Sequence, residues 1–478
     1  MPAGHIEQTR LYPTTVTKPF ILPLQWCAPA DALAALGGRA GSLGFIGGGP
    51  HELARWSCVM DAPVRIHQWR GDRDATPAFA GLQATLDHLQ LIPDPDCGPF
   101  QGGWAGLLSY ELGGAFEAVP RPPAQGQNWP DVWLGLYDTV AVFDSHLQRA
   151  FIVSWGLNTD LQADPTRAQT KALGFAARLR GPLPPPARGR GNDLTPVLAR
   201  PLAEAAIARA VNYIKAGDVF QANISLSFQG LLAGDDTPLH LFSRLVARHP
   251  SPFATFLSLG DCAVVSHSPE RFLSRTAGGQ LETRPIKGTA ARDPDPVKDC
   301  AQAARLAASE KDRAENLMIV DLMRNDLARV CVPGSVHVPR LCALESFSTV
   351  HHLVSDVIGQ QREGSGFFDA LAASFPPGSI TGAPKVRAME IIWELEQQAR
   401  GPWCGSMIRV GFDGSAESNV LIRTAACVQD AASQAWHVTA RAGAGIVADS
   451  DPAQEYEEML MKVRALRVAA RNEPKGRS

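Results

Sequence analysis

The chain has 478 residues, of which 45% are hydrophobic and 19% charged, and this predicts a globular protein with one large domain or two to three smaller ones. A formal net charge of -3 excludes a basic nucleic-acid-binding surface, and no run reaches the roughly 18 apolar residues of a membrane span. Residues 1–7 lack the order of a signal peptide, and nine scattered cysteines without CxxC pairs indicate a reducing cytoplasm.

The first part of the chain, up to about residue 160, alternates short apolar runs with Gly and Pro turns, which predicts antiparallel strands. The clearest examples are 133–137, 140–143 and 150–155. The stretch 181–191 is rich in Pro and Gly, disfavours regular structure and has little apolar surface to bury. We therefore predict an N-terminal region over 14–180, a linker over 181–200 and a catalytic domain over 201–471.

Helical and strand patterns mix after the linker. Residues 201–216 predict an amphipathic helix and 220–228 a strand. A long helix is predicted over about 295–329, and a last helix over 451–471 with Asp451 as its N-cap. Strands mixed with long helices indicate an α+β fold, in which helices lie outside a layered β-sandwich core.

Lys287 lies in the run RPIKGT (284–289), where proline and glycine restrict the backbone and can hold a side chain toward a pocket. A lysine held there can be a counter-ion, a solvent-facing charge or an amine nucleophile with a lowered pKa. The string alone favours a surface lysine before a turn.

Two predicted helices carry carboxylates at i,i+3 spacing, Asp312 with Glu315 and Glu455 with Glu458. This spacing puts both acids of a pair on one helical face. Two such faces meeting across a cleft would form an all-oxygen site for Mg²⁺. Solvated faces that pair with neighbouring lysines explain the same spacing and are common.

Two Gly-rich segments are also ambiguous by themselves. The run 376–385 can open a helix whose first N–H groups, with the hydroxyls of Ser379 and Thr381, bind an anion, or it can be a simple turn. The run AGAG (442–445) permits close approach to a ligand or tight strand packing. His352 can be a core histidine or can handle a proton.

Taken in order, these segments resemble the chorismate-utilising enzymes, which include the anthranilate synthase large subunit, aminodeoxychorismate synthase component I, isochorismate synthase and salicylate synthase. The resemblance spans about 200–470, and a weaker similarity is found at 99–104 and 109–112. The strings that carry it are GDVFQ (217–221), SPERF (268–272), RPIKGT (284–289), AENLMIVDLMRNDL (314–327), HLVS (352–355), PPGSITGAPKVRAME (376–390), IRT (422–424), AGAG (442–445) and EYEE (455–458).

Three positions distinguish the branches of this family. Gln221 stands where water-adding members carry a lysine base, which disfavours hydroxylation. Lys287 stands where anthranilate synthases carry alanine, and Trp403 where other branches carry tyrosine. The resemblance thus implies amination of chorismate by ammonia to 4-amino-4-deoxychorismate, for 4-aminobenzoate and folate synthesis, through a lysine-bound intermediate. Anthranilate synthesis is the alternative.

The resemblance also implies the family's fold and a role for each candidate residue. Lys287 attacks the substrate, Glu270 protonates the departing hydroxyl, and His352 orients the ring or the leaving hydroxyl. Mg²⁺ is held by Glu315 and Glu458, and Asp312 and Glu455 help through water. Contacts with substrate come from Gln221, Thr289, Ser379, Gly382, Trp403, Arg423, Gly443, Gly445 and Lys462.

Use of ammonia implies a partner, because the chain has no recognisable glutaminase nucleophile. A glutamine amidotransferase subunit is expected to supply the ammonia, and a separate aminodeoxychorismate lyase to consume the product. The stretch 44–49 lacks the serine and acid with which anthranilate synthases bind regulatory tryptophan, so tryptophan feedback is not expected. No nucleic-acid or membrane partner is expected.

Overall fold

The computed structural model describes residues 17–71, 74–89, 91–119, 129–187, 189, 191–347 and 350–472. The expectation about a signal peptide at 1–7 lies outside these residues, as do positions 188 and 190 of the linker. Within the described residues, no helix is both long and apolar enough to cross a membrane.

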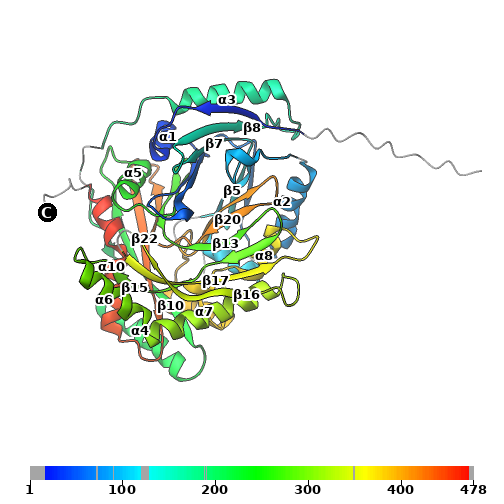
Figure 1. The fold of residues 1–478 in the computed structure, drawn as a ribbon. Helices are drawn as coiled ribbons and strands as arrows, with labels where there is room; N and C mark the ends of the chain where they lie inside the picture. Colours follow the sequence, from blue (N-terminus) through cyan, green and yellow to red (C-terminus); the bar gives the residue numbers. More distant parts are fainter. Residues whose placement is uncertain are drawn as a thin grey trace, which may run out of the picture.

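The strands of the described residues form two large antiparallel sheets (Figure 1). The first has 12 strands in the order β1 (Phe20–Leu24), β8 (Arg149–Ser154), β7 (Thr139–Asp144), β3 (Trp56–Met60), β2 (Leu43–Ile46), β11 (Phe253–Ser258), β12 (Cys262–Ser268), β21 (Thr424–Gln429), β22 (Trp436–Ile446), β10 (Gln221–Leu231) and β18 (Gly382–Ala383), with β9 (Thr195–Pro196) paired to β10.

The second sheet has 10 strands within the same described ranges. Their order is β15 (Ile286–Ala291), β17 (Val350–Gln360), β14 (Gln280–Thr283), β13 (Arg271–Arg275), β20 (Ala416–Asn419), β19 (Ser406–Gly411), β5 (Gly103–Leu108), β6 (Val132–Tyr137) and β4 (Arg65–Trp69), with β16 (His337–Ser346) paired to β17.

The helices cover the outer faces of the two sheets. The α-helices are α1 (Pro29–Ala35), α2 (Thr76–His88), α3 (Pro165–Leu179), α4 (Arg200–Lys215), α5 (Pro238–Arg248), α6 (Pro296–Ala307), α7 (Glu310–Ala328), α8 (Phe367–Ser374), α9 (Lys385–Glu396) and α10 (Pro452–Ala470). Short 3₁₀ helices are η1 (Glu52–Ala54), η2 (Pro95–Cys97), η3 (Tyr110–Ala115) and η4 (Gly378–Ile380).

Alternation along the strands explains the layers. Successive side chains of a strand point to opposite faces. In β12, Val264 joins a core between the sheets, whereas Val265 joins a core under α1, α3, α4, α5, α9 and α10. A third core lies between the second sheet and helices α2, α7 and α8. The predicted β-sandwich core with outer helices is confirmed.

Most predicted elements are confirmed, but the single helix over 295–329 is wrong. The chain forms α6 and α7, separated at Ala308 and Ser309. Ser309 has an extended backbone, and its hydroxyl accepts a hydrogen bond from the Asp312 N–H at 3.2 Å. Helical spacing continues across this break because a serine cap restarts the helix without a Gly or Pro.

Both sheets contain strands from before and after 181–200. For example, β2 pairs with β11 in the first sheet, and β5 pairs with β19 in the second. The residues before and after 181–200 therefore share one β-sandwich. The division into an N-terminal region, a linker and a catalytic domain stays a prediction from the sequence.

We expect Ser309→Ala to loosen the first turn of α7, because one N–H of that turn loses its acceptor. Losing an N-cap costs about 1 kcal/mol, so amide hydrogen exchange in this turn should accelerate roughly fivefold. Ser309→Thr, which keeps a hydroxyl, is the control and should exchange like the wild type. Unchanged exchange in the alanine variant would contradict the capping role.

Candidate active site

The floor of the candidate site is the pairing of β10 with β22. Asn223 lies opposite Gly445, and Ser225 opposite Gly443. A Cβ added at Gly445 would lie 3.0 Å from Gln221 Nε2 and 3.1 Å from Lys287 Nζ. Glycine therefore lets both side chains approach this strand without being displaced by a side chain at 445.

Lys287 reaches this floor from the edge of the second sheet. It lies in β15 opposite Leu353 of β17, and the pairing register shifts between Lys287 and Thr289. Gly288 makes this bulge with φ +83°, and a Cβ there would lie 2.9 Å from the Asp312 Cβ. The predicted glycine turn thus lets β15 approach α7 closely.

The ammonium of Lys287 is destabilised by its surroundings. Burial lowers its pKa, and the charge of Lys462 lowers it further, against the attraction of Glu315, Glu270 and Glu458. A larger share of this amine is therefore neutral, and nucleophilic, than for an exposed lysine.

Glu270 is a buried carboxyl at the start of β13. Its Oε1 accepts a hydrogen bond from Ser379 Oγ at 2.7 Å. Burial raises the pKa of Glu270 to about 7, although Ser379 and the positive charges of Lys287, Lys462 and Arg423 act to lower it. This acid keeps a substantial protonated fraction near neutral pH and can donate a proton.

His352 is a neutral, buried imidazole. Burial and the charge of Arg423 lower its pKa to about 4, and its Nδ1 lies 2.9 Å from Thr289 Oγ1. The ring of Phe347 meets it edge-on at 5.4 Å. Two neighbours thus fix the ring, which suits orientation of a ligand better than uptake of a proton. Thr289 itself is exposed.

The four carboxylates predicted to hold Mg²⁺ lie on α7 and α10, but they are not gathered into a metal cage. Among the described residues, no group of three or more His, Cys, Asp or Glu side chains is placed to hold a metal ion. Glu458 is instead paired with Lys462 at 2.6 Å, and Lys462 also donates to the Gly443 carbonyl at 2.9 Å.

The donor set still fits Mg²⁺. Burial raises the pKa of both Glu315 and Glu455; the charges of Asp312 and Glu455 add to the shift at Glu315, and that of Glu458 to the shift at Glu455. The carboxylates of α7 and α10 therefore lie close enough to repel one another. Mg²⁺ is commonly bound by one or two carboxylates together with water and substrate oxygens, which is what these residues offer.

Several buried polar atoms at the floor have no protein partner. They are both amide atoms of Gln221, Asn223 Oδ1 and Trp403 Nε1. Asn223 Oδ1 and the Trp403 ring flank Gly443, where an added Cβ would lie 2.4 Å and 2.9 Å from them. Such atoms cost about 1–3 kcal/mol each unless water or a ligand satisfies them.

Asn223 is the residue that the sequence reasoning missed. Its signal was present, because Gln221 and Asn223 are two positions apart in a predicted strand and therefore share a face.

For the run 376–385, the sequence left open an anion-binding helix start and a simple turn. The run forms the short helix η4 and the strand β18 before α9 begins. The Thr381 hydroxyl donates to the Pro377 carbonyl at 2.9 Å, and Ser379 donates to Glu270. Gly382 has φ +139°, and a Cβ there would lie 2.2 Å from the Gln221 carbonyl oxygen. The segment serves to bring Ser379 and β18 against the floor.

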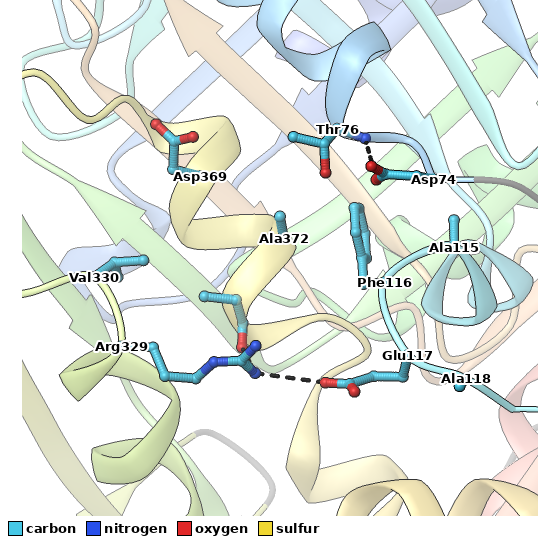
Figure 2. Close-up of a pocket in the computed structure, with 11 residues that line it drawn as sticks. Asp74, Thr76, Ala115, Phe116, Glu117, Ala118, Arg329, Val330, Asp369 and Ala372 are labelled. Atoms are coloured by element: carbon cyan, nitrogen blue, oxygen red, sulfur yellow. Dashed lines mark hydrogen bonds and ion pairs between the residues drawn. The ribbon is translucent and has the colours of Figure 1, made fainter.

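A separate cavity of about 630 Å³ contains none of the predicted site residues (Figure 2). Arg329 crosses it to Glu117 at 3.4 Å and also donates to the Ala373 carbonyl. The Asp74 carboxylate accepts from the Thr76 N–H. The charged groups that line this cavity are engaged with one another and with the backbone, which distinguishes them from the unpartnered polar atoms at the floor of β10 and β22.

The chain is similar to known proteins in both sequence and structure. A sequence model of the family described as chorismate binding enzyme matches residues 53–468, and so includes the region where the strings gave only a weaker similarity. An aminodeoxychorismate synthase component 1 of Salmonella typhimurium is 42% identical over 390 residues, covering 80% of each chain.

Two further relatives are similar. An anthranilate synthase component 1 of Streptomyces coelicolor is 39% identical over 433 residues, covering 88% of this chain and 81% of the relative. The crystal structure of anthranilate synthase component I from Streptococcus pneumoniae has a TM-score of 0.73 at 27% identity, covering 86% of this chain and 92% of that one.

We expect Glu270→Gln to stabilise the chain at alkaline pH. The pKa of Glu270 is about 7 in the fold and 4.5 for an unperturbed glutamate. The stability that the neutral acid contributes is thus present below about pH 4.5 and lost as the pH rises through about 7. The neutral amide avoids this loss, which is at most about 3 kcal/mol.

Thermal unfolding of wild type and variant at pH 5 and pH 8 measures this difference. The variant should have a higher melting temperature than wild type at pH 8, and this difference in melting temperature should be smaller at pH 5. Glu363→Gln, at an exposed position, is the control. A difference in melting temperature that is the same at pH 5 and pH 8 would show that Glu270 is ionised in the folded protein at both pH values.

Proposed function

The chain belongs to the chorismate binding enzyme family, and from that premise we propose that it is an aminodeoxychorismate synthase component 1. It would convert chorismate and ammonia to 4-amino-4-deoxychorismate, the precursor of 4-aminobenzoate in folate synthesis. The observation that carries this choice is Lys287, whose amine lies at the floor beside Gly445 with a pKa lowered by burial.

The reaction would need two displacements. The neutral Lys287 amine attacks C2 of chorismate, both ring double bonds shift by one position, and the C4–oxygen bond breaks while Glu270 gives its proton to the departing hydroxyl, which leaves as water. Ammonia then forms a bond to C4, both double bonds shift back, and the bond between C2 and the Lys287 nitrogen breaks. The carbon that lost the hydroxyl receives the nitrogen.

The other residues of the site would hold the substrate. Arg423 suits a carboxylate, because a guanidinium can pair with both oxygens. Gln221, Asn223 and Trp403 supply unpartnered donors and acceptors, and His352 would orient the ring. The Gly443 carbonyl is already bound by Lys462, so the backbone near Gly445 is the more available contact.

Mg²⁺ bound by Glu315 and Glu458, with Asp312 and Glu455 acting through water, would polarise the ring carboxylate of the substrate. For Glu458 this requires that Lys462 release its carboxylate.

Anthranilate synthesis is the second candidate, because the relative from Streptomyces coelicolor is 39% identical and covers more of this chain than the relative from Salmonella typhimurium. It would use ammonia at C2 directly. Lys287 argues against it, since a lysine amine at the floor occupies the approach to that carbon.

A partner subunit follows from the use of ammonia. The relative in Salmonella typhimurium is named component 1, and a glutamine amidotransferase is the class of protein that would deliver ammonia to this site. A lyase acting on the released product would complete the route to 4-aminobenzoate.

The purified chain, incubated with chorismate, Mg²⁺ and ammonium at mildly alkaline pH, should release 4-amino-4-deoxychorismate, identified by mass and ultraviolet spectrum. Adding a lyase should convert it to 4-aminobenzoate. Lys287→Ala should abolish the covalent adduct seen by protein mass spectrometry and slow turnover at least about 100-fold, because the oriented nucleophile is gone.

Lys298→Ala, at an exposed position of α6, controls for loss of a lysine as such and should behave like wild type. Fluorescent anthranilate as the wild-type product would contradict the assignment. Undiminished turnover by Lys287→Ala would remove its role as nucleophile.

We expect Glu315→Gln and Glu458→Gln to raise the Mg²⁺ concentration needed for half-maximal activity by about tenfold or more, as for changes near other metal sites. A Mg²⁺ titration at saturating chorismate measures this. Asp321→Asn, whose side chain is 77% exposed on α7, should leave the titration unchanged. Unaltered titrations of both glutamine variants would refute the metal assignment.

A further inference from the structure

Arg400 is a buried arginine outside the motifs that predicted the site, in the segment between α9 and β19. Its side chain is 1% exposed and is paired with Glu396 of α9 at 2.7 Å. We propose that Arg400, held by Glu396, is a positioning residue that fixes three walls of the chorismate site relative to one another; this rests on the function proposed above.

Two hydrogen bonds from Arg400 connect separate walls. Its Nη2 donates to the Asn223 carbonyl at 2.6 Å, and its Nη1 donates to the Ile380 carbonyl at 3.2 Å. Asn223 belongs to the floor strand β10, while Ile380 follows Ser379, which donates to Glu270. One guanidinium therefore sets the distance between the floor and the segment that contacts the catalytic acid.

The third wall is Trp403. The guanidinium carbon of Arg400 lies 5.0 Å from the centre of the Trp403 ring and 4.6 Å from that of Tyr110. Stacking of this kind favours a planar cation. The indole whose N–H has no protein partner is thus packed against the same group that binds the floor backbone.

Glu396 fixes the orientation of the guanidinium. Its Oε2 accepts from Arg400 Nε at 3.1 Å, and its Oε1 accepts from Arg400 Nη2 at 2.7 Å. The same Oε1 accepts from the N–H and the hydroxyl of Ser225, both at 2.9 Å. Burial opposes ionisation of Glu396, but the charges of Arg400 and Arg441 hold its pKa below the usual value. The carboxylate therefore ties Arg400 to a second point of β10.

A lysine cannot replace this arginine. It has three donors on one nitrogen and no planar face, whereas Arg400 uses three different nitrogens and stacks on two rings. Arg400→Lys keeps the charge beside Glu396 but cannot keep every contact. A displacement of the site by about 1 Å can cost on the order of 100-fold in rate, so we expect kcat/KM for chorismate to fall by about this factor.

The matched control is the ion pair of Arg244 with Asp236. Asp236 is buried, and Arg244 pairs with it at 2.6 Å and donates to the Ala469 carbonyl. Arg244→Lys makes the same chemical change in a pair that contacts none of the site residues. It should keep the wild-type kcat and KM.

The pH profile separates positioning from general loosening of the fold. If Ser379 retreats from Glu270, the acid loses a donor that lowers its pKa, and the pH at which kcat falls should move upward. If the site merely opens to water, Glu270 is less buried and its pKa falls. The pH at which kcat falls should then move downward.

Wild type, Arg400→Lys, Glu396→Gln and Arg244→Lys are compared by circular dichroism, steady-state kinetics with chorismate and the pH profile of kcat. The proposal is supported if kcat/KM falls in Arg400→Lys and Glu396→Gln but not in Arg244→Lys, and if the pH at which kcat falls moves upward in those two variants. Wild-type kinetics, or a loss of kcat/KM with this pH unmoved or moved downward, overturns it. If Arg400→Lys does not fold, Glu396→Gln decides by the same criteria.

The product of the wild-type enzyme tests the proposed function separately. If that product were anthranilate, the assignment above would fail, whereas the comparison of variants would still decide the role of Arg400 with anthranilate as the readout.

Discussion

The pairing of β10 with β22 is the constraint on which the candidate site depends. Two strands of 11 residues each run side by side, and one of them lacks side chains at 443 and 445. Because a Cβ at either position would collide with a neighbouring side chain, the glycines let Lys287 approach from the second sheet and Trp403 from the segment before β19. The site is thus formed where the edge strand β15 of the second sheet approaches β10 and β22 of the first.

Burial has opposite effects on the two groups that carry the proposed chemistry. It raises the pKa of Glu270 and lowers that of Lys287, because each prefers its neutral form away from water. Their mutual attraction would favour the ion pair, but burial outweighs it at both residues. Both shifts favour the neutral forms, and a protonated acid beside a neutral amine is the combination that a displacement with protonation of the leaving group requires.

The sequence predicts the local parts of this arrangement well and the long-range parts only through resemblance. Alternation in 133–137 and 150–155 predicts strands because the period of two depends on neighbouring residues alone. The break at Ser309 was missed because a serine cap leaves the helical spacing intact. Arg400 gave no signal, since its partners Asn223 and Ile380 are distant in sequence and are bonded through backbone carbonyls, which no side-chain pattern records.

The unpartnered polar atoms at the floor show how the fold and the proposed function depend on each other. Gln221 is fully buried, yet neither of its amide atoms has a protein partner, and Asn223 Oδ1 is in the same state. A buried polar atom of this kind costs about 1–3 kcal/mol when neither water nor a ligand bonds to it, whereas apolar residues of similar shape carry no such cost. Arg400 bonds to the Asn223 carbonyl and Glu396 to Ser225, so both contact β10 beside these amides. A polar ligand that bonds to these atoms satisfies them, so they contribute to recognition of the substrate.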